Sequence, residues 1–237
     1  PPRSTLFPYT TLFRSVRWDG ALHLHLSKSD CWGFHAPPDA PMGSRFFNNV
    51  SPGHVRLDLG GRAKEAAARR FRQRLDLYHG RVVVELGDDR QGPRLEIWGH
   101  PARKILVVEV IDPRSVLDGA RVELSEWRPT MRLGIAEREV FSHEVNDRPA
   151  RPHLVNTGMQ DFFGSDNDPL KGRGTAVVVR SPVAASKTIA SGDRAATLSI
   201  GGQPPASYYV LVAAAVTPSG DPLAAAQGCV KEGLYFY

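Results

Sequence analysis

Short stretches of alternating apolar and polar residues, separated by turn-forming residues, recur along most of this sequence. The clearest example is ALHLHLSK at residues 21–28. Similar stretches follow at residues 55–59, 71–77, 81–86, 94–98, 104–110 and 120–127. A period of two is typical of strands that bury one face. Because no long helix separates these stretches, βαβ units are excluded, and we expect antiparallel connections.

The second half of the chain continues the pattern more loosely. Further strands are predicted at residues 137–145, 174–181, 195–200 and 207–216. We therefore predict an all-β fold, a large antiparallel two-sheet sandwich of the supersandwich kind, with alternate side chains buried between the layers. The predicted core residues are Leu22, Leu24, Leu26, Leu57, Leu59, Val82, Val84, Ile97, Leu106, Val108 and Val110.

Two stretches carry helix signals. Residues 63–70 are rich in alanine and predict about two turns of helix. Residues 221–231 begin with an Asp-Pro pair followed by alanines, which is the start signal of a helix with Asp221 at the N-cap and Pro222 at the first helical position. We expect a short C-terminal linker helix there.

Charge and apolar content limit the possible partners. The net charge of +5 comes from arginines scattered along the chain among acidic residues. The densest cluster, residues 68–77, alternates like a strand, with Phe71, Gln73, Leu75 and Leu77 on one face. This pattern favours a solvated strand over a phosphate-binding patch, so no nucleic-acid partner is predicted. No apolar run reaches the roughly 18 residues of a membrane span, so no membrane segment is predicted.

The chain ends look different from its middle. Residues 5–15 resemble the translation of a sequencing adapter, so we treat residues 1–15 as an artefact outside the domain. The predicted organisation is a sandwich over residues 16–216 and the start of a linker over residues 217–237. The sequence leaves the compartment open, including secretion or export to the periplasm.

The strongest local candidate for a binding site is the loop at residues 27–35, together with residues 45–50. Flat apolar rings and polar groups in one loop are typical of carbohydrate sites. The candidate carbohydrate-binding residues are Asp30, Trp32, Phe34, His35 and Asn48. The alternative is structural: Trp32 closes one end of the sandwich and Asp30 caps the turn.

Three other patterns are weaker. His23 and His25 have the spacing of metal ligands on one strand face, but no third ligand is evident. Residues 164–169 offer clustered oxygens without the spacing of an EF-hand. Cys31 with His35 lacks an orienting third group, and Cys31 and Cys229 match no disulfide framework or metal spacing. We predict no metal site, no cofactor and no catalytic residue in this chain.

The ordered series at residues 19–33, 50–59, 71–86, 95–110 and 122–128 resembles a known family. It is similar to the N-terminal β-sandwich listed as domain-of-unknown-function family 5703, found in bacterial glycosidases with a barrel of six helical hairpins that look related to glycoside hydrolase family 95. The resemblance implies that the acid and base carboxylates belong to the barrel. The residues after Asp221 are far fewer than the roughly 200 that twelve helices with their loops require.

The resemblance therefore implies a non-catalytic sandwich that supports a helical (α/α)6 barrel missing from this chain. An autonomous carbohydrate-binding module is the alternative. We also expect an exposed apolar patch near residues 207–226, where the barrel would pack.

Overall fold

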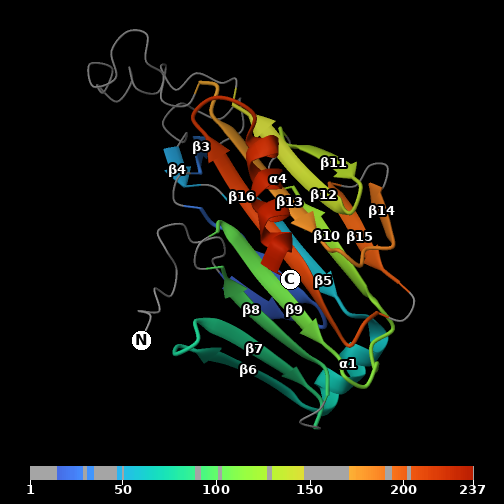
Figure 1. Cartoon of the computed structure of the whole chain (residues 1–237). Coiled ribbons are helices and arrows are strands. Elements are labelled where there is room, and N and C mark those ends of the chain that lie inside the picture. Colours follow the sequence, from blue (N-terminus) through green and yellow to red (C-terminus); the bar gives the residue numbers. More distant parts are fainter. Residues whose placement is uncertain are drawn as a thin grey trace.

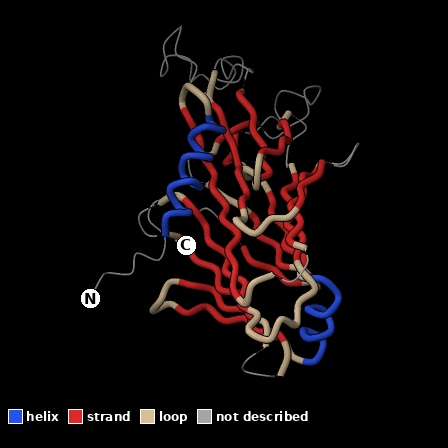
Figure 2. The backbone as a smooth tube through the Cα atoms, turned by 45° about the vertical axis from the view of Figure 1, so that its right-hand side comes forward, coloured by secondary structure: helices blue, strands red, loops and turns tan. Residues whose placement is uncertain are grey.

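The computed structural model describes residues 15–28, 31–34, 47–49, 51–88, 92–100, 103–126, 130–146, 171–189, 194–201 and 204–236. Within these residues, two large antiparallel sheets pack face to face, and two short strands form a separate ribbon (Figure 1). Helix α4 lies along the outside of one sheet, and helix α1 lies at one end of the sandwich (Figure 2). The predicted all-β two-sheet sandwich is confirmed.

The first sheet has six strands in the described part of the chain. In spatial order, its strands are β1 (Ser15–Trp18), β2 (Leu22–His25), β5 (His54–Asp58), β10 (Ala120–Ser125), β15 (Ala195–Ile200) and β14 (Ser186–Ile189). Neighbouring strands are antiparallel, and β5 joins β2 to β10. Its edge strands, β1 and β14, are short.

The second sheet has eight strands among the residues described. In spatial order, they are β11 (Arg132–Ala136), β12 (Glu139–Val145), β13 (Gly174–Arg180), β16 (Ser207–Thr217), β9 (Ile105–Ile111), β8 (Arg94–Gly99), β7 (Arg81–Leu86) and β6 (Phe71–Asp76). All of these pairings are antiparallel. The small ribbon pairs β3 (Trp32–Phe34) with β4 (Phe47–Asn49).

The core is a layer of aliphatic side chains between the two sheets. Every residue predicted for the core belongs to this buried cluster. Alternation along each strand produces it: on β2, Leu22 and Leu24 are buried, whereas His23 and His25 lie outside the layer and are half-buried. Each aliphatic side chain contributes about 1.5–3 kcal/mol by leaving water. The period-two pattern therefore identified the inward face correctly.

Strand β6 departs from the expected pattern. Its register places Phe71, Gln73 and Leu75 opposite the inward residues of β7, yet Phe71 is 39% exposed and Leu75 is 56% exposed. The reason is the unequal width of the sheets. The ring of Trp18, on edge strand β1, stacks on Phe71 with centroids 5.7 Å apart, and no described strand beyond β1 covers Leu75.

Both predicted helices form. Helix α1 (Gly60–Arg69) begins three residues before the alanine-rich stretch and buries Ala63 and Ala66 against the core. Helix α4 (Pro222–Gly233) begins where the Asp-Pro signal placed it, and a 3-10 turn (Leu234–Phe236) follows it. Neither helix, in the part of the chain that is described, has the length or apolar character needed to cross a bilayer.

The difference between β5 and β6 is testable with a matched pair of leucines. Leu57 is 1% exposed, so Leu57→Ala leaves a cavity and should lower the free energy of unfolding by about 2–5 kcal/mol. Leu75→Ala removes a side chain that is 56% exposed and should change it by no more than about 0.5 kcal/mol. Urea unfolding of both variants measures the difference. Equal losses would contradict the placement of β6.

The start of α4 makes a second prediction. The Asp221 carboxylate accepts hydrogen bonds from the backbone N–H groups of Leu223 (2.8 Å) and Ala224 (3.2 Å). Asp221→Ala should cost about 0.5–2 kcal/mol, whereas Asp221→Asn should retain most of the stability. Hydrogen exchange at the Leu223 and Ala224 amides localises the effect. Unchanged exchange in Asp221→Ala would show that the cap does not hold the helix end.

Candidate functional site

Helix α4 covers part of the outer face of the eight-stranded sheet. Outward residues of β9, β13 and β16 form a second apolar cluster with the buried face of the helix. Its buried members are Ile105, Val107, Ala176, Val178, Leu211, Ala213, Ala215, Ala226 and Val230. Four of these are alanines, and small side chains let a helix approach a sheet closely. A Cβ atom added at Gly233 would lie 2.6 Å from Ile105 Cδ1, which confirms how tight the approach is.

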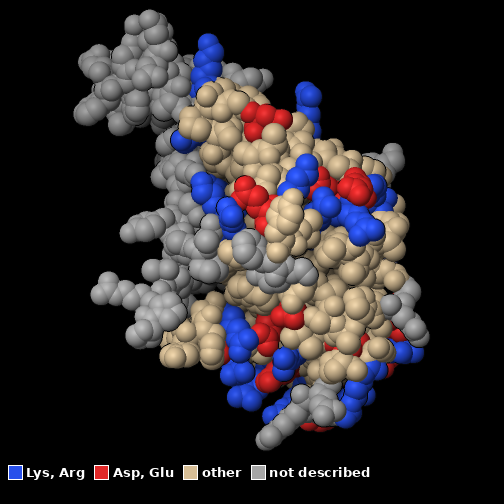
Figure 3. Space-filling model, viewed as in Figure 1, with Lys and Arg blue, Asp and Glu red and all other residues tan. Residues whose placement is uncertain are grey.

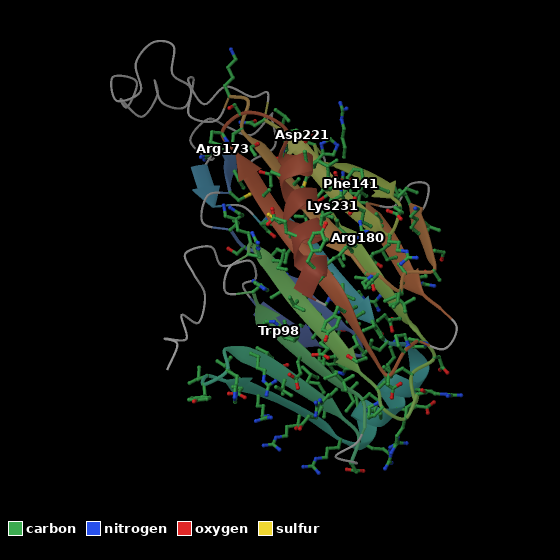
Figure 4. The ribbon with its side chains drawn as sticks, viewed as in Figure 1. Trp98, Phe141, Arg173, Arg180, Asp221 and Lys231 are labelled. Carbon is green, nitrogen blue, oxygen red and sulfur yellow. The ribbon has the colours of Figure 1, made fainter. Side chains whose placement is uncertain are left out.

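Polar contacts fix the helix on both flanks. On β12, the Glu139 carboxylate is buried, accepts from the Arg180 guanidinium at 3.4 Å and also accepts from the Gln227 amide of α4. At the other flank, Arg103 and Glu232 form an ion pair at 2.6 Å. Figure 4 shows Arg180 beside α4 and Trp98 beyond the C-terminal end of the helix. These contacts set where the helix lies on the sheet.

The expectation of an exposed apolar patch near residues 207–226 is wrong. Strand β16 is buried along most of its length, because its inward residues join the core and its outward residues lie under α4. Among the described residues, the exposed large apolar side chains lie elsewhere, and Leu75, Leu77 and Tyr78 gather at the β6–β7 hairpin. Helix α4 itself covers the apolar surface that we expected the missing helical barrel to cover.

Beyond the C-terminal end of α4, the same outer face becomes polar. We call this area the polar shelf and define it by Arg81, Glu96, Trp98, Glu109 and Tyr209. The register places Arg81 opposite Trp98, Glu96 opposite Glu109, and Glu109 opposite Tyr209. Figure 3 shows charges of both signs close together on this part of the face.

Ion pairs organise one side of the polar shelf. The buried Glu96 carboxylate contacts the guanidinium groups of Arg81 and, at 3.4 Å, Arg94. Arg81 also reaches Asp76 at 3.5 Å. Hydrogen bonds from the side chain and backbone of His79, with smaller contributions from the charges of His79 and Arg81, lower the pKa of the Asp76 carboxyl. The network holds these charged groups in place.

The second carboxylate of the polar shelf, that of Glu109, accepts from hydroxyl groups. Glu109 Oε1 accepts from Ser207 Oγ at 2.7 Å and from the Tyr209 hydroxyl at 3.2 Å. Glycoside hydrolysis needs one carboxyl that keeps its proton and a second that acts as base or nucleophile. Glu96 is instead committed to guanidinium groups and Glu109 to hydroxyl donors. The polar shelf therefore suits binding or docking better than acid–base chemistry.

The residues predicted for carbohydrate binding are only partly described. Asp30 and His35 lie outside the described residues. Trp32 and Phe34 belong to β3 and Asn48 to β4, and the backbone register places Gly33 opposite Asn48. The structure thus brings residues 32–34 beside residues 47–49, which the sequence separates by twelve positions.

The remaining candidates gain no support as reactive groups. Cys31 is buried, with its Sγ 3.8 Å from Thr175 Oγ1. Cys229 is a half-buried free thiol whose pKa is raised by burial. Residues 164–169 lie outside the described residues.

A hollow of about 480 Å³ beside β7 is lined by Arg70, Arg72, Glu85, Gly87, Asp88, Gly92, Pro93 and Arg94.

Sequence reasoning did not identify the polar shelf. The stretch at residues 94–98 was predicted as a strand with Ile97 in the core, and no role was assigned to Glu96 or Trp98. An aromatic residue two positions from a carboxylate was the available signal. The partners on β9 and β16 come from distant parts of the chain, and only the strand order brings them together.

Comparisons with known proteins are distant. No protein-family model and no curated protein matches the chain. Among solved structures, a chain from the human microbiome assigned as a kojibiose phosphorylase is 11% identical with a TM-score of 0.43, and the match covers 91% of this chain and 30% of that one. A GH31 family sulfoquinovosidase from E. rectale is 9% identical with a TM-score of 0.35, covering 85% of this chain and 32% of the other. This chain thus spans about a third of either protein, and at these scores neither similarity bears on its activity.

Proposed function

We propose that this chain is the non-catalytic β-sandwich of a glycoside-acting enzyme and that its eight-stranded sheet supports a helical domain with an (α/α)6 barrel. Helix α4 is then the first helix of the linker that leads toward the barrel. The observation that carries the proposal is the packing of α4 on the outer face of this sheet, through alanines and a glycine. The face is thus built to receive a helix.

The polar shelf extends the same face beyond the end of the helix. Glu96 is paired with the guanidinium groups of Arg81 and Arg94. Glu109 accepts hydrogen bonds from two hydroxyl groups, so a partner that covers the shelf leaves neither carboxylate without a partner. Trp98 and Tyr209 contact the apolar cluster under α4 and extend the apolar surface onto the shelf. Interfaces between domains of one chain are typically mixed in this way. We assign the polar shelf to the helical domain as its docking surface.

The proposal predicts a difference between two lengths of the protein. A longer reading frame that contains this sequence and continues past Tyr237 should encode a helical domain and act on glycosides. The present chain should show no hydrolysis or phosphorolysis with the same aryl glycosides and disaccharides, because the acid and base belong to the helical domain. Turnover by the present chain, or a continuation without helical hairpins, would contradict the proposal.

A charge reversal on the polar shelf tests the docking surface in that longer protein. Glu109→Lys reverses the charge at the shelf position that accepts from Ser207 and Tyr209. It should lower the melting temperature of the longer protein by several degrees more than that of the present chain. Glu123→Lys is the matched control, because Glu123 lies on the outer face of the other sheet and its side chain is 31% exposed. Equal shifts in both lengths would place the helical domain elsewhere.

The second candidate function is an autonomous carbohydrate-binding module. The observation that favours it is the pairing of β3 with β4, which brings residues 32–34 beside residues 47–49. Trp32, Phe34 and Asn48 are then neighbouring positions of one ribbon, and Asp30 and His35 flank it in sequence. Aromatic rings supply a flat apolar surface, and nearby amide and carboxylate groups supply hydrogen bonds, which are the contacts that a bound sugar uses.

Calorimetry with a panel of oligosaccharides distinguishes the two candidates. A binding module should bind at least one oligosaccharide, and Trp32→Ala should weaken that binding at least tenfold through loss of the stacking ring. Trp98→Ala is the control, because it removes an equally large ring from the polar shelf. No binding to any oligosaccharide would exclude the module, whereas loss only in Trp98→Ala would move the sugar site to the shelf.

A further inference from the structure

Three histidines gather on the outer face of the six-stranded sheet, away from α4 and the polar shelf. His23 and His25 are two positions apart on β2, so they share a face, and the register places His25 opposite His54 of β5. The His54 ring is nearly parallel to both of the others, with centroids 5.1 Å from His23 and 4.6 Å from His25. All three are half-buried.

Two ring nitrogens in this group face each other. His23 Nδ1 and His54 Nε2 are 3.1 Å apart. In a tetrahedral site with metal–nitrogen bonds of about 2.0–2.1 Å, two ligating nitrogens lie about 3.3 Å apart. The two ring nitrogens therefore already have nearly the separation that a shared metal ion requires.

The other nitrogen of each ring has its own partner. His23 Nε2 lies 2.8 Å from Asp19 Oδ1, and His54 Nδ1 lies 3.3 Å from Ser125 Oγ. Metal-binding histidines commonly donate their second N–H to a carboxylate or another oxygen, which fixes the tautomer and the ring orientation. Asp19 and Ser125 occupy the positions of such outer partners. Asp19 precedes β2, and Ser125 lies on β10.

We propose that His23 Nδ1, His54 Nε2 and a ring nitrogen of His25 bind one divalent transition-metal ion, Zn²⁺ in the first instance. Three imidazoles are an established ligand set for zinc. Among the described residues, no group of three or more His, Cys, Asp or Glu side chains is already arranged to hold a metal ion. The proposed site therefore requires the His25 ring to turn about its side-chain bonds toward the other two nitrogens. The ion links β2 to β5 across the sheet.

Calorimetric titration of the tag-free, chelator-treated chain with ZnCl₂ tests the site. We expect one ion per chain, and His23→Ala and His54→Ala should each weaken Zn²⁺ binding at least tenfold. His25→Ala should also weaken it. Asp19→Asn keeps all three imidazoles and removes only the outer carboxylate, so it should weaken binding about 10–100-fold.

His79→Ala is the matched control, because His79 is an exposed histidine that also contacts an aspartate, Asp76, at 2.8 Å. It should leave Zn²⁺ affinity unchanged. Urea unfolding of each metal-free variant verifies folding, and Asp19→Asn, at an exposed turn, keeps the test valid if His54→Ala does not fold. Absence of Zn²⁺ binding by the wild-type chain, equal affinity in His54→Ala and His79→Ala, or full affinity in His25→Ala would overturn the proposal.

Discussion

The apolar layer between the two sheets fixes the direction of every other side chain on the strands. Its members, such as Leu24, Val84 and Ile97, are almost fully buried, and each contributes about 1.5–3 kcal/mol. A one-residue slip of any strand would expose these residues and bury their polar neighbours, so the register is strongly specified. The outward positions of His23 and Glu96 follow from the inward positions of the residues beside them.

The same layer explains where the surface departs from the usual pattern. The eight-stranded sheet extends past the six-stranded one, and Trp18 of β1 covers Phe71 but not the rest of β6. Leu75 has the sequence pattern of a core residue and the exposure of a surface residue. Strand β6 is an edge strand of its sheet among the described residues, and an exposed edge with apolar side chains is a position where further strands or partners add readily.

The sequence predicted the fold well because a period of two carries the information about which face is buried. The core residues, the helix beginning after Asp221 and the antiparallel arrangement all follow from local pattern, and all are confirmed. The exposure of β6 does not follow, since it depends on how many strands the opposite sheet has. The patch expected near residues 207–226 was wrong for a related reason: the pattern does not say which face the helix covers.

The candidate sites were harder to predict because their residues come from strands distant in sequence. His23 and His25 were recognised as a pair with metal-ligand spacing, but the third imidazole belongs to β5, and only the pairing of β2 with β5 brings His54 to them. Glu96 and Glu109 meet in the same way, through the pairing of β8 with β9. Spacing along one strand identifies half of such a site, and strand order supplies the rest.

The two outer faces of the sandwich differ in whether a helix covers them, and their outward residues differ accordingly. Under α4, the eight-stranded sheet presents alanines and aliphatic residues, because a helix covers them. The six-stranded sheet has no helix on its outer face among the described residues, and its outward positions on β5 and β10 include His54, Arg56, Glu123 and Ser125. A solvated face must carry polar groups, and where strands pair closely these groups are held at fixed separations. An uncovered face of this kind is therefore where a sheet can assemble ligands for a small ion, whereas the apolar face under α4 is already occupied by the helix.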